Sequence, residues 1–195
     1  MIDARLQLRI AIEQVATMPN QAWMLGAAHF QELRLAKGQF FVRPGAVCQR
    51  AAFVAQGLLR SFHPHEDGTE TTTCFCAANT FSTAYRSFVQ QLPSKVSMQA
   101  VENTQLLVID HQALQELCTH SPEWLRLSAA LVEKECLSLE HYAAVLNRET
   151  AKEKYQRLLR EQPYVLQRAP VQHVASYLGI SRETLSRVRR QVSTG

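Results

Sequence analysis

The sequence contains no long hydrophobic run. No window of its 195 residues approaches 18 consecutive apolar residues, so we predict no transmembrane helix and no membrane partner. Charged side chains interrupt the first sixteen residues, whereas a secretory signal peptide needs an unbroken apolar segment. The cysteines are odd in number and unevenly spaced, which predicts reduced thiols rather than a disulfide framework. We therefore expect a cytoplasmic protein with five free thiols, at Cys48, Cys74, Cys76, Cys118 and Cys136.

Motifs of enzymes and cofactor sites are also missing. The chain has no glycine-rich phosphate loop, no Ser/His/Asp arrangement and no paired carboxylates at a spacing typical of catalysis. These absences predict a protein that is not an enzyme and that carries no cofactor.

One pattern resembles a metal site. His63, His65 and Glu70 follow Gly57 at the spacing of the first cupin motif, which builds a site from two histidines and a glutamate inside a jelly roll. The glycine that closes this motif is missing, and the turn signal Asp67-Gly68 places both histidines at a hairpin tip. A solvated turn is the simpler interpretation, so we predict no metal and keep a cupin-like metal-binding jelly-roll protein as an alternative.

A second pattern is the pair Cys74-x-Cys76. On a strand both thiols would point to the same face. Such a pair could bind a metal or sense an oxidant, but two small residues facing a core are the simpler interpretation.

Charge is distributed unevenly along the chain. Ten Lys and Arg residues and four Asp and Glu residues lie between residue 148 and the end, a net charge of +6, while the preceding part carries −2. A basic C-terminal part on a mildly acidic body predicts a polyanion partner for that part alone. Because 46% of the residues are hydrophobic and 19% charged, a real core can form.

The N-terminal half predicts helices followed by a β-roll. Residues 1 to about 30 have a helical pattern, and from Leu33 short β-prone runs alternate with turn signals. Leu58–Phe62 and Thr69–Cys76 are expected to form a hairpin, and Lys95–Val101 and Gln105–Ile109 to pair as the last strands. This spacing favours an antiparallel barrel or jelly roll, so we predict an α+β protein with a β-roll domain over residues 1–120. The turn signals are Lys37-Gly38, Arg43-Pro44-Gly45, Gln56-Gly57, Asp67-Gly68 and Ala78-Asn79, and Glu102-Asn103-Thr104 is the last turn.

A long helix is predicted over residues 121–147. Ser121-Pro122-Glu123 is a strong helix start, with a capping serine, proline at the first position and an acid in the first turn. Apolar residues then recur every seven positions, which is typical of a dimerisation helix, whereas a single core helix is the simpler alternative. The predicted homodimer seam is Leu125, Ala129, Val132, Cys136, Leu139, Ala143 and Leu146.

Residues 148–195 predict a helix-turn-helix domain. An apolar stripe over residues 171–178 is followed by Gly179, which can adopt the positive φ that ends a helix, and by Ser181, a good N-cap. The second helix, residues 182–193, has Leu185 and Val188 on one face and arginines on the other. Arginine can pair bidentately with guanine and glutamate can accept from cytosine, so this helix is a candidate recognition helix for the major groove of double-stranded DNA.

The order of these parts resembles the Crp/Fnr family of bacterial transcription regulators. The stretches that carry the resemblance are LAKGQFFVRPGAVCQRAAFVAQGLLRS, QAVENTQLLVID and, most specifically, HVASYLGISRETLSRVRR. The resemblance implies a cyclic-nucleotide-binding-like roll, a homodimer that binds a palindromic DNA site, and RNA polymerase as a further candidate partner. It implies base contacts from Arg182, Glu183 and Arg187 and phosphate contacts from Ser181 and Thr184. Arg190 on the same helix is a further candidate for DNA binding.

Two features depart from the family pattern. Cyclic-nucleotide-binding members have Phe-Gly-Glu and Arg-Ser/Thr-Ala in the phosphate-binding cassette, whereas this chain has Phe81-Ser82-Thr83 and Ser94-Lys95-Val96. The carboxylate for the ribose is missing and the phosphate arginine is a serine, so we expect that the effector is not cyclic AMP. The alternatives are an unidentified small molecule or a cyclic nucleotide in a rebuilt pocket, for which the candidate residues are Phe81, Ser82, Thr83, Arg86, Ser94 and Lys95.

The second departure is that no wing hairpin follows the recognition helix in this sequence. Phosphate contacts are therefore expected to depend more on other basic residues, namely Lys152, Lys154, Arg157, Arg160 and Arg190.

Overall fold

The computed structural model describes residues 3–146 and 149–193. Two helices, α1 (Ala4–Glu13) and α2 (Asn20–Ala27), precede eight strands, and the short helix α3 (Tyr85–Gln90) lies between the sixth and seventh. The strands are β1 (Gln31–Leu35), β2 (Phe40–Val42), β3 (Arg50–Gln56), β4 (Leu58–Pro64), β5 (Glu70–Ala77), β6 (Thr80–Ser82), β7 (Ser97–Ala100) and β8 (Thr104–Asp110).

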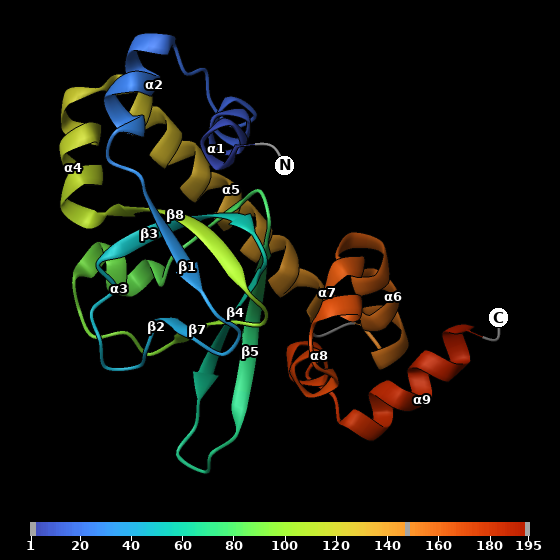
Figure 1. Cartoon of the computed structure of the whole chain (residues 1–195). Helices are drawn as coiled ribbons and strands as arrows, with labels where there is room; N and C mark the ends of the chain where they lie inside the picture. The colour runs from blue at the N-terminus through green and yellow to red at the C-terminus, as the bar shows by residue number, and fades with distance from the viewer. Residues whose placement is uncertain (1–2, 147–148, 194–195) are drawn as a thin grey trace.

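In the described ranges, six helices follow the last strand. After α4 (His111–His120), the long helix α5 (Pro122–Leu146) runs along the roll to the C-terminal helices (Figure 1). We call residues 151–193 the C-terminal helical unit, which consists of α6 (Ala151–Glu161), α7 (Pro163–Arg168), α8 (Val171–Leu178) and α9 (Arg182–Ser193). Within the described ranges, no helix combines the length and apolar character needed to cross a membrane.

The strands form two antiparallel four-stranded sheets, with the orders β1-β8-β3-β6 and β2-β7-β4-β5. The predicted jelly-roll architecture is therefore confirmed. The turn signals also hold: Gly38, Gly45, Gly57, Gly68 and Asn79 all have positive φ. At these positions the chain reverses in a conformation that glycine and asparagine tolerate best.

Side chains alternate between the two faces of each sheet, and this alternation divides the apolar residues into three cores. Val54 on β3 and Leu59 on β4 point into the core between the sheets. Their neighbour Phe53 packs instead with Trp124 and the N-terminal helices. Leu58 packs on the opposite side, in a core shared with the C-terminal helical unit. The roll is thus a sandwich that has helices against both outer faces.

The predicted pairing of Lys95–Val101 with Gln105–Ile109 is wrong. β7 pairs with β2 and β4, whereas β8 pairs with β1 and β3, so the two strands belong to different sheets. The connecting residues cross from one sheet to the other, because β7 pairs with two strands of one sheet and β8 with two strands of the other. Proximity in sequence favours a hairpin, but non-local partners determine the pairing in a jelly roll.

Helices α4 and α7 both begin without a side-chain cap. Asp110 precedes α4 but makes no side-chain cap, because its backbone still belongs to β8, where it pairs with Arg50. The segment Pro163–Arg168 forms the short helix α7, with proline at its first turn.

Candidate nucleic-acid interface

α8 and α9 form a helix-turn-helix. Gly179 adopts the left-handed conformation, with φ of 67°, and the amide of Ile180 donates to the carbonyl of Ala175 over 3.0 Å, which ends α8 with a Schellman-type bond. The hydroxyl of Ser181 accepts a hydrogen bond from the amide of Thr184 over 3.1 Å and so caps α9. The turn residues predicted from the sequence therefore have the local roles expected of them.

An apolar core fixes the angle between the two helices. Leu185 and Val188 of α9 are buried in the same cluster as Val174, Ala175 and Leu178 of α8, as predicted. Side chains from α6 and α7 complete this cluster. Because one side of α9 is anchored in this core, its other side is presented as a rigid surface.

The exposed side of α9 carries the predicted DNA contacts. Arg182, Glu183, Arg187 and Arg190 are exposed, and Thr184 is half-buried. α8 lies between β5 and α9, so that α9 is outermost in the C-terminal helical unit (Figure 1). Hydrogen bonds from its own backbone and from Ser181 lower the pKa of the Glu183 carboxyl, which keeps it ionised and able to accept.

The basic residues of α6 serve two different purposes. Lys152 and Arg160 are exposed, whereas Arg157 pairs with Glu149 over 3.0 Å with only 11% of its side chain exposed. The Lys154 amine donates to the carbonyl of Leu178 over 3.4 Å, at the end of α8. Arg157 and Lys154, which were expected to contact phosphate, therefore already bind partners within the protein.

α5 presents two different faces. Trp124, Leu127 and Leu131 pack into the core with the N-terminal helices. Most of the predicted seam lies elsewhere on the helix: Leu125, Ala129, Cys136 and Leu139 are exposed and Val132 is half-buried. Ala143 and Leu146 lie outside the residues whose side chains the structure describes.

The six predicted effector residues do not form a charged cluster. Arg86 and Lys95 are exposed, and the Arg86 guanidinium bonds to Gln90. The buried Ser94 hydroxyl donates to the carbonyl of Val96 over 2.8 Å. The remaining three lie near the end of β6: Phe81 stacks on Phe53, Ser82 donates to Cys76, and Thr83 donates to the carbonyl of Arg50.

The residues of the two patterns that resemble metal sites make other contacts. Glu70 pairs with Arg60 instead of facing the histidines, and His65 bonds to Thr71 at the hairpin end. In the part of the chain that the structure describes, no group of three potential ligands is close enough to hold a metal. Cys74 and Cys76 have their sulfurs 3.5 Å apart on β5.

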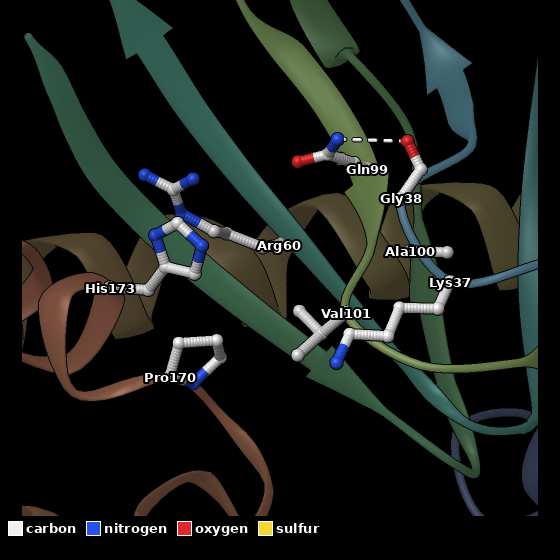
Figure 2. A pocket seen from close by; sticks show the side chains of 8 residues that line it. All are labelled: Lys37, Gly38, Arg60, Gln99, Ala100, Val101, Pro170 and His173. Atoms are coloured by element: carbon white, nitrogen blue, oxygen red, sulfur yellow. Dashed lines mark hydrogen bonds between the residues drawn. The ribbon is translucent and has the colours of Figure 1, made fainter.

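Sequence reasoning missed a cleft between the roll and the C-terminal helical unit. Its volume is about 100 Å³, and it lies where β4 and β7 face the start of α8 (Figure 2). Its lining includes the side chains of Lys37, Arg60, Gln99, Val101, Pro170 and His173. The sequence did contain a signal for this cleft, because Arg60 is the one charged residue in the largely apolar run LLRSF.

Several polar contacts join the two sides of this cleft. The Ser176 hydroxyl of α8 donates to the carbonyl of Glu70 over 2.7 Å and accepts from the amide of Thr72 over 2.9 Å. Arg168 pairs with Glu102 at the crossing between the sheets. The C-terminal helical unit is therefore docked on β5 by hydrogen bonds as well as by the shared apolar core.

Comparison with known proteins shows which proteins share this architecture. Residues 32–121 match the sequence family of the cyclic nucleotide-binding domain. FixK2 from Bradyrhizobium japonicum has a TM-score of 0.74 at 18% identity, over 85% of this chain and 85% of that one. The chain has the fold of Crp/Fnr regulators. The predicted resemblance to these regulators is thereby confirmed for the fold.

Two further solved structures share this Crp/Fnr fold. CLP from Xanthomonas campestris, named a c-di-GMP responsive global regulator, has a TM-score of 0.69 at 19% identity, over 90% of this chain and 92% of that one. A protein from Eubacterium rectale, described as a transcriptional regulator of the Crp/Fnr family, has a TM-score of 0.70 at 16% identity, over 91% and 84%. A search of curated protein sequences found no match.

Proposed function

We propose that this chain is a homodimeric transcriptional regulator that binds a palindromic DNA site through α9 and has no catalytic activity. One observation carries the proposal: α9 is anchored by Leu185 and Val188 while Arg182, Glu183 and Arg187 project from its opposite side. A major groove about 12 Å wide admits a helix, and arginine and glutamate distinguish base pairs by the groups displayed there.

Charge supports the same role. The excess of basic residues is confined to the C-terminal part, so phosphate attraction would concentrate where α9 lies. Exposed Lys152 and Arg160 on α6 are the remaining candidates for phosphate contacts from that helix. RNA polymerase stays a candidate partner, for which no surface is assigned.

The dimer proposal rests on the second face of α5. Its core-facing residues are already buried by the N-terminal helices, yet Leu125 and Leu139 remain exposed at heptad spacing. A second α5 packed against this seam would bury them and would relate two α9 helices by a two-fold axis. Such a pair fits half-sites about one helical turn apart. The proposed division of the chain is accordingly a roll over residues 1–120, a dimer helix over 121–147 and a DNA-binding domain over 148–195.

Arginine substitution tests the DNA contact. We expect Arg182→Ala and Arg187→Ala each to weaken binding to a selected duplex, since each lost bidentate contact costs about 1–3 kcal/mol per half-site. Fluorescence anisotropy at fixed salt measures this loss. Arg34→Ala is the matched control. The side chain of Arg34 on β1 is 80% exposed, and its substitution removes the same charge from the roll instead of from α9. Equal affinity of all variants and wild type would refute the role of α9.

The effector proposal is that the roll senses a molecule other than cyclic AMP or serves as a structural platform. Ser94 stands where the family has the phosphate-binding arginine, and its hydroxyl is already bonded within its own turn. No carboxylate stands at residues 81–83 to hold a ribose.

A cyclic-nucleotide-responsive regulator with a rebuilt pocket is the second candidate, which the family match of residues 32–121 favours. Calorimetry with cyclic AMP, cyclic GMP and cyclic di-GMP separates the two, the last because CLP is named for it. Heat and a thermal shift with any of these nucleotides would favour the second candidate.

A further inference from the structure

The most unusual side chain outside the proposed DNA interface is Arg60. Only 1% of it is exposed, although it carries a full charge. It lies on β4, on the face that packs against the C-terminal helical unit, and its guanidinium stacks 4.1 Å from the centre of the Phe62 ring. Burying an ion costs several kcal/mol unless partners compensate, so each nitrogen of the guanidinium needs a partner.

Two of its three nitrogens have such partners. Nε donates to the hydroxyl of Thr72 over 2.8 Å, and Nη1 donates to the carboxylate of Glu70 over 2.6 Å. Nη2 is buried and has no hydrogen-bond acceptor among the described residues. A guanidinium presents its donors in a planar fork, so Nη2 can offer up to two hydrogen bonds. A buried donor of this kind in a native protein calls for an explanation.

The side chain of Arg60 lines the cleft between the roll and α8. Figure 2 shows the guanidinium of Arg60 beside the imidazole of His173, with Lys37 on the opposite side of the cleft. The cleft volume of about 100 Å³ exceeds the 10–15 Å³ or so that one water needs. The space therefore admits a group of several heavy atoms beside the side chain of Arg60.

The lining of the cleft favours a negatively charged ligand. It contains Lys37, Arg60 and His173 but no aspartate or glutamate. Among the described residues, Glu70 is the carboxylate that pairs with the guanidinium, and it is bound to Nη1 and partly exposed. Pro170 in the cleft wall is the N-cap of α8 and provides no side-chain cap, so the positive end of the dipole of α8 adds to the same field.

We propose that this cleft is a binding site for a small oxyanion, a phosphate or carboxylate group, that accepts hydrogen bonds from Arg60 Nη2 and is approached by His173 and Lys37. Because Arg60 belongs to β4 and His173 to α8, the bound anion links the roll to the helix-turn-helix. The site lies apart from residues 81–95, and its occupation does not depend on whether α9 binds DNA.

The charge state of His173 gives the site a pH dependence. Burial, and then the positive charge of Arg60, lower the pKa of His173, while Glu70 opposes the shift. Lys37 is the other charged group that lines the cleft. A bound anion would favour the protonated imidazole, so binding takes up a proton and strengthens as pH falls below about 6.5.

Titration of the full chain with inorganic phosphate, sulfate and acetate at constant ionic strength tests the proposal. Thermal shift and calorimetry are expected to show saturable stabilisation by at least one of them, and acetate alone would assign the site to carboxylates. Sulfate keeps its charge between pH 5 and 8, so tighter sulfate binding at the acidic end would report the protonation of His173. A flat profile would remove His173 from the site.

Arg60→Met is the decisive variant. Methionine is similar in length and removes the buried charge, so the variant is expected to fold at least as well as wild type without the anion. It should lose about tenfold or more of the anion affinity, the value of a charge-assisted hydrogen bond. Arg34→Met, on exposed β1, is the matched control and should bind like wild type.

Two results would overturn the proposal. One is the absence of any saturable shift with all three anions, which would mean that only water solvates Nη2. The other is anion binding that Arg60→Met leaves unchanged. Should Arg60→Met fail to fold, His173→Gln and Lys37→Ala, which change residues with side chains nearer the surface, provide the same comparison, and full affinity in both would equally overturn it.

Discussion

Leu139→Ala is predicted to weaken the proposed dimer about 100-fold. Leu139 lies on the heptad seam of α5 and is 58% exposed in the single chain. The substitution removes three carbons, about 2.4 kcal/mol when fully buried at about 0.8 kcal/mol per methylene. Scaled by the exposed fraction, the loss is about 1.4 kcal/mol per protomer and about 3 kcal/mol per dimer, which corresponds to about 100-fold in the dissociation constant.

The chain offers a matched control for this prediction. Leu137 is on the same helix and is 61% exposed, but it lies off the seam. Leu137→Ala should therefore leave the dimer unchanged, and alanine favours helix in both variants. Sedimentation equilibrium over a range of concentrations measures both constants. Equal weakening by the two variants, or a monomeric wild type at every concentration, would refute the seam.

Three further predictions concern stability. Gly57→Ala should cost about 2–6 kcal/mol in urea unfolding, because φ is +103° and a Cβ would clash with the Thr104 hydroxyl. Gly179→Ala, with φ of +67° and open space around the Cβ, should cost only about 1–2 kcal/mol, and equal costs for the two variants would contradict this. Because the pKa of His173 is lowered in the folded protein, the unfolded chain binds a proton at a higher pH than the folded chain does. The free energy of unfolding should therefore fall from pH 7 toward pH 5, and His173→Gln should flatten that slope. Leu185→Ala should cost about 2–5 kcal/mol, seen by circular dichroism as early melting of helix, and an unchanged transition would refute its anchoring role.

Local signals were sufficient to predict the helix-turn-helix and the long helix. Gly179 and Ser181 act within one turn of their own position, so their roles follow from backbone geometry alone. The turn signals from Gly38 to Asn79 were equally reliable, because positive φ is a property of single residues. Two leucines of the heptad pattern, Leu125 and Leu139, are exposed in the single chain, as a dimer seam on α5 requires.

Strand partners and the cleft could not be predicted in the same way. β7 and β8 are neighbours in sequence, but their pairing depends on β1, β2, β3 and β4 together. The cleft needs Arg60 and His173, which are more than a hundred positions apart and meet only when α8 docks on β5. The lone arginine in an apolar strand was a visible signal, but its partners were not.

The same limit applies to the charges on α6. Arg157 and Lys154 seemed equivalent to Lys152 and Arg160 in sequence, since all four lie on one basic helix. The structure separates them by tertiary contacts, an ion pair with Glu149 for Arg157 and a helix-end carbonyl for Lys154. Charge counts therefore predict the sign of a partner better than they predict which residues touch it.

In-vitro selection of DNA duplexes by the 195-residue chain tests whether two α9 helices bind DNA as a symmetric pair. We expect enrichment of an inverted repeat whose half-sites are centred about 10–10.5 base pairs apart, or a multiple of that spacing, because two α9 helices related by a two-fold axis enter successive turns of one groove. Enrichment should disappear for the protein with both Arg182→Ala and Arg187→Ala. Recovery of no common sequence, or of the same sequence by that double variant, would contradict the account.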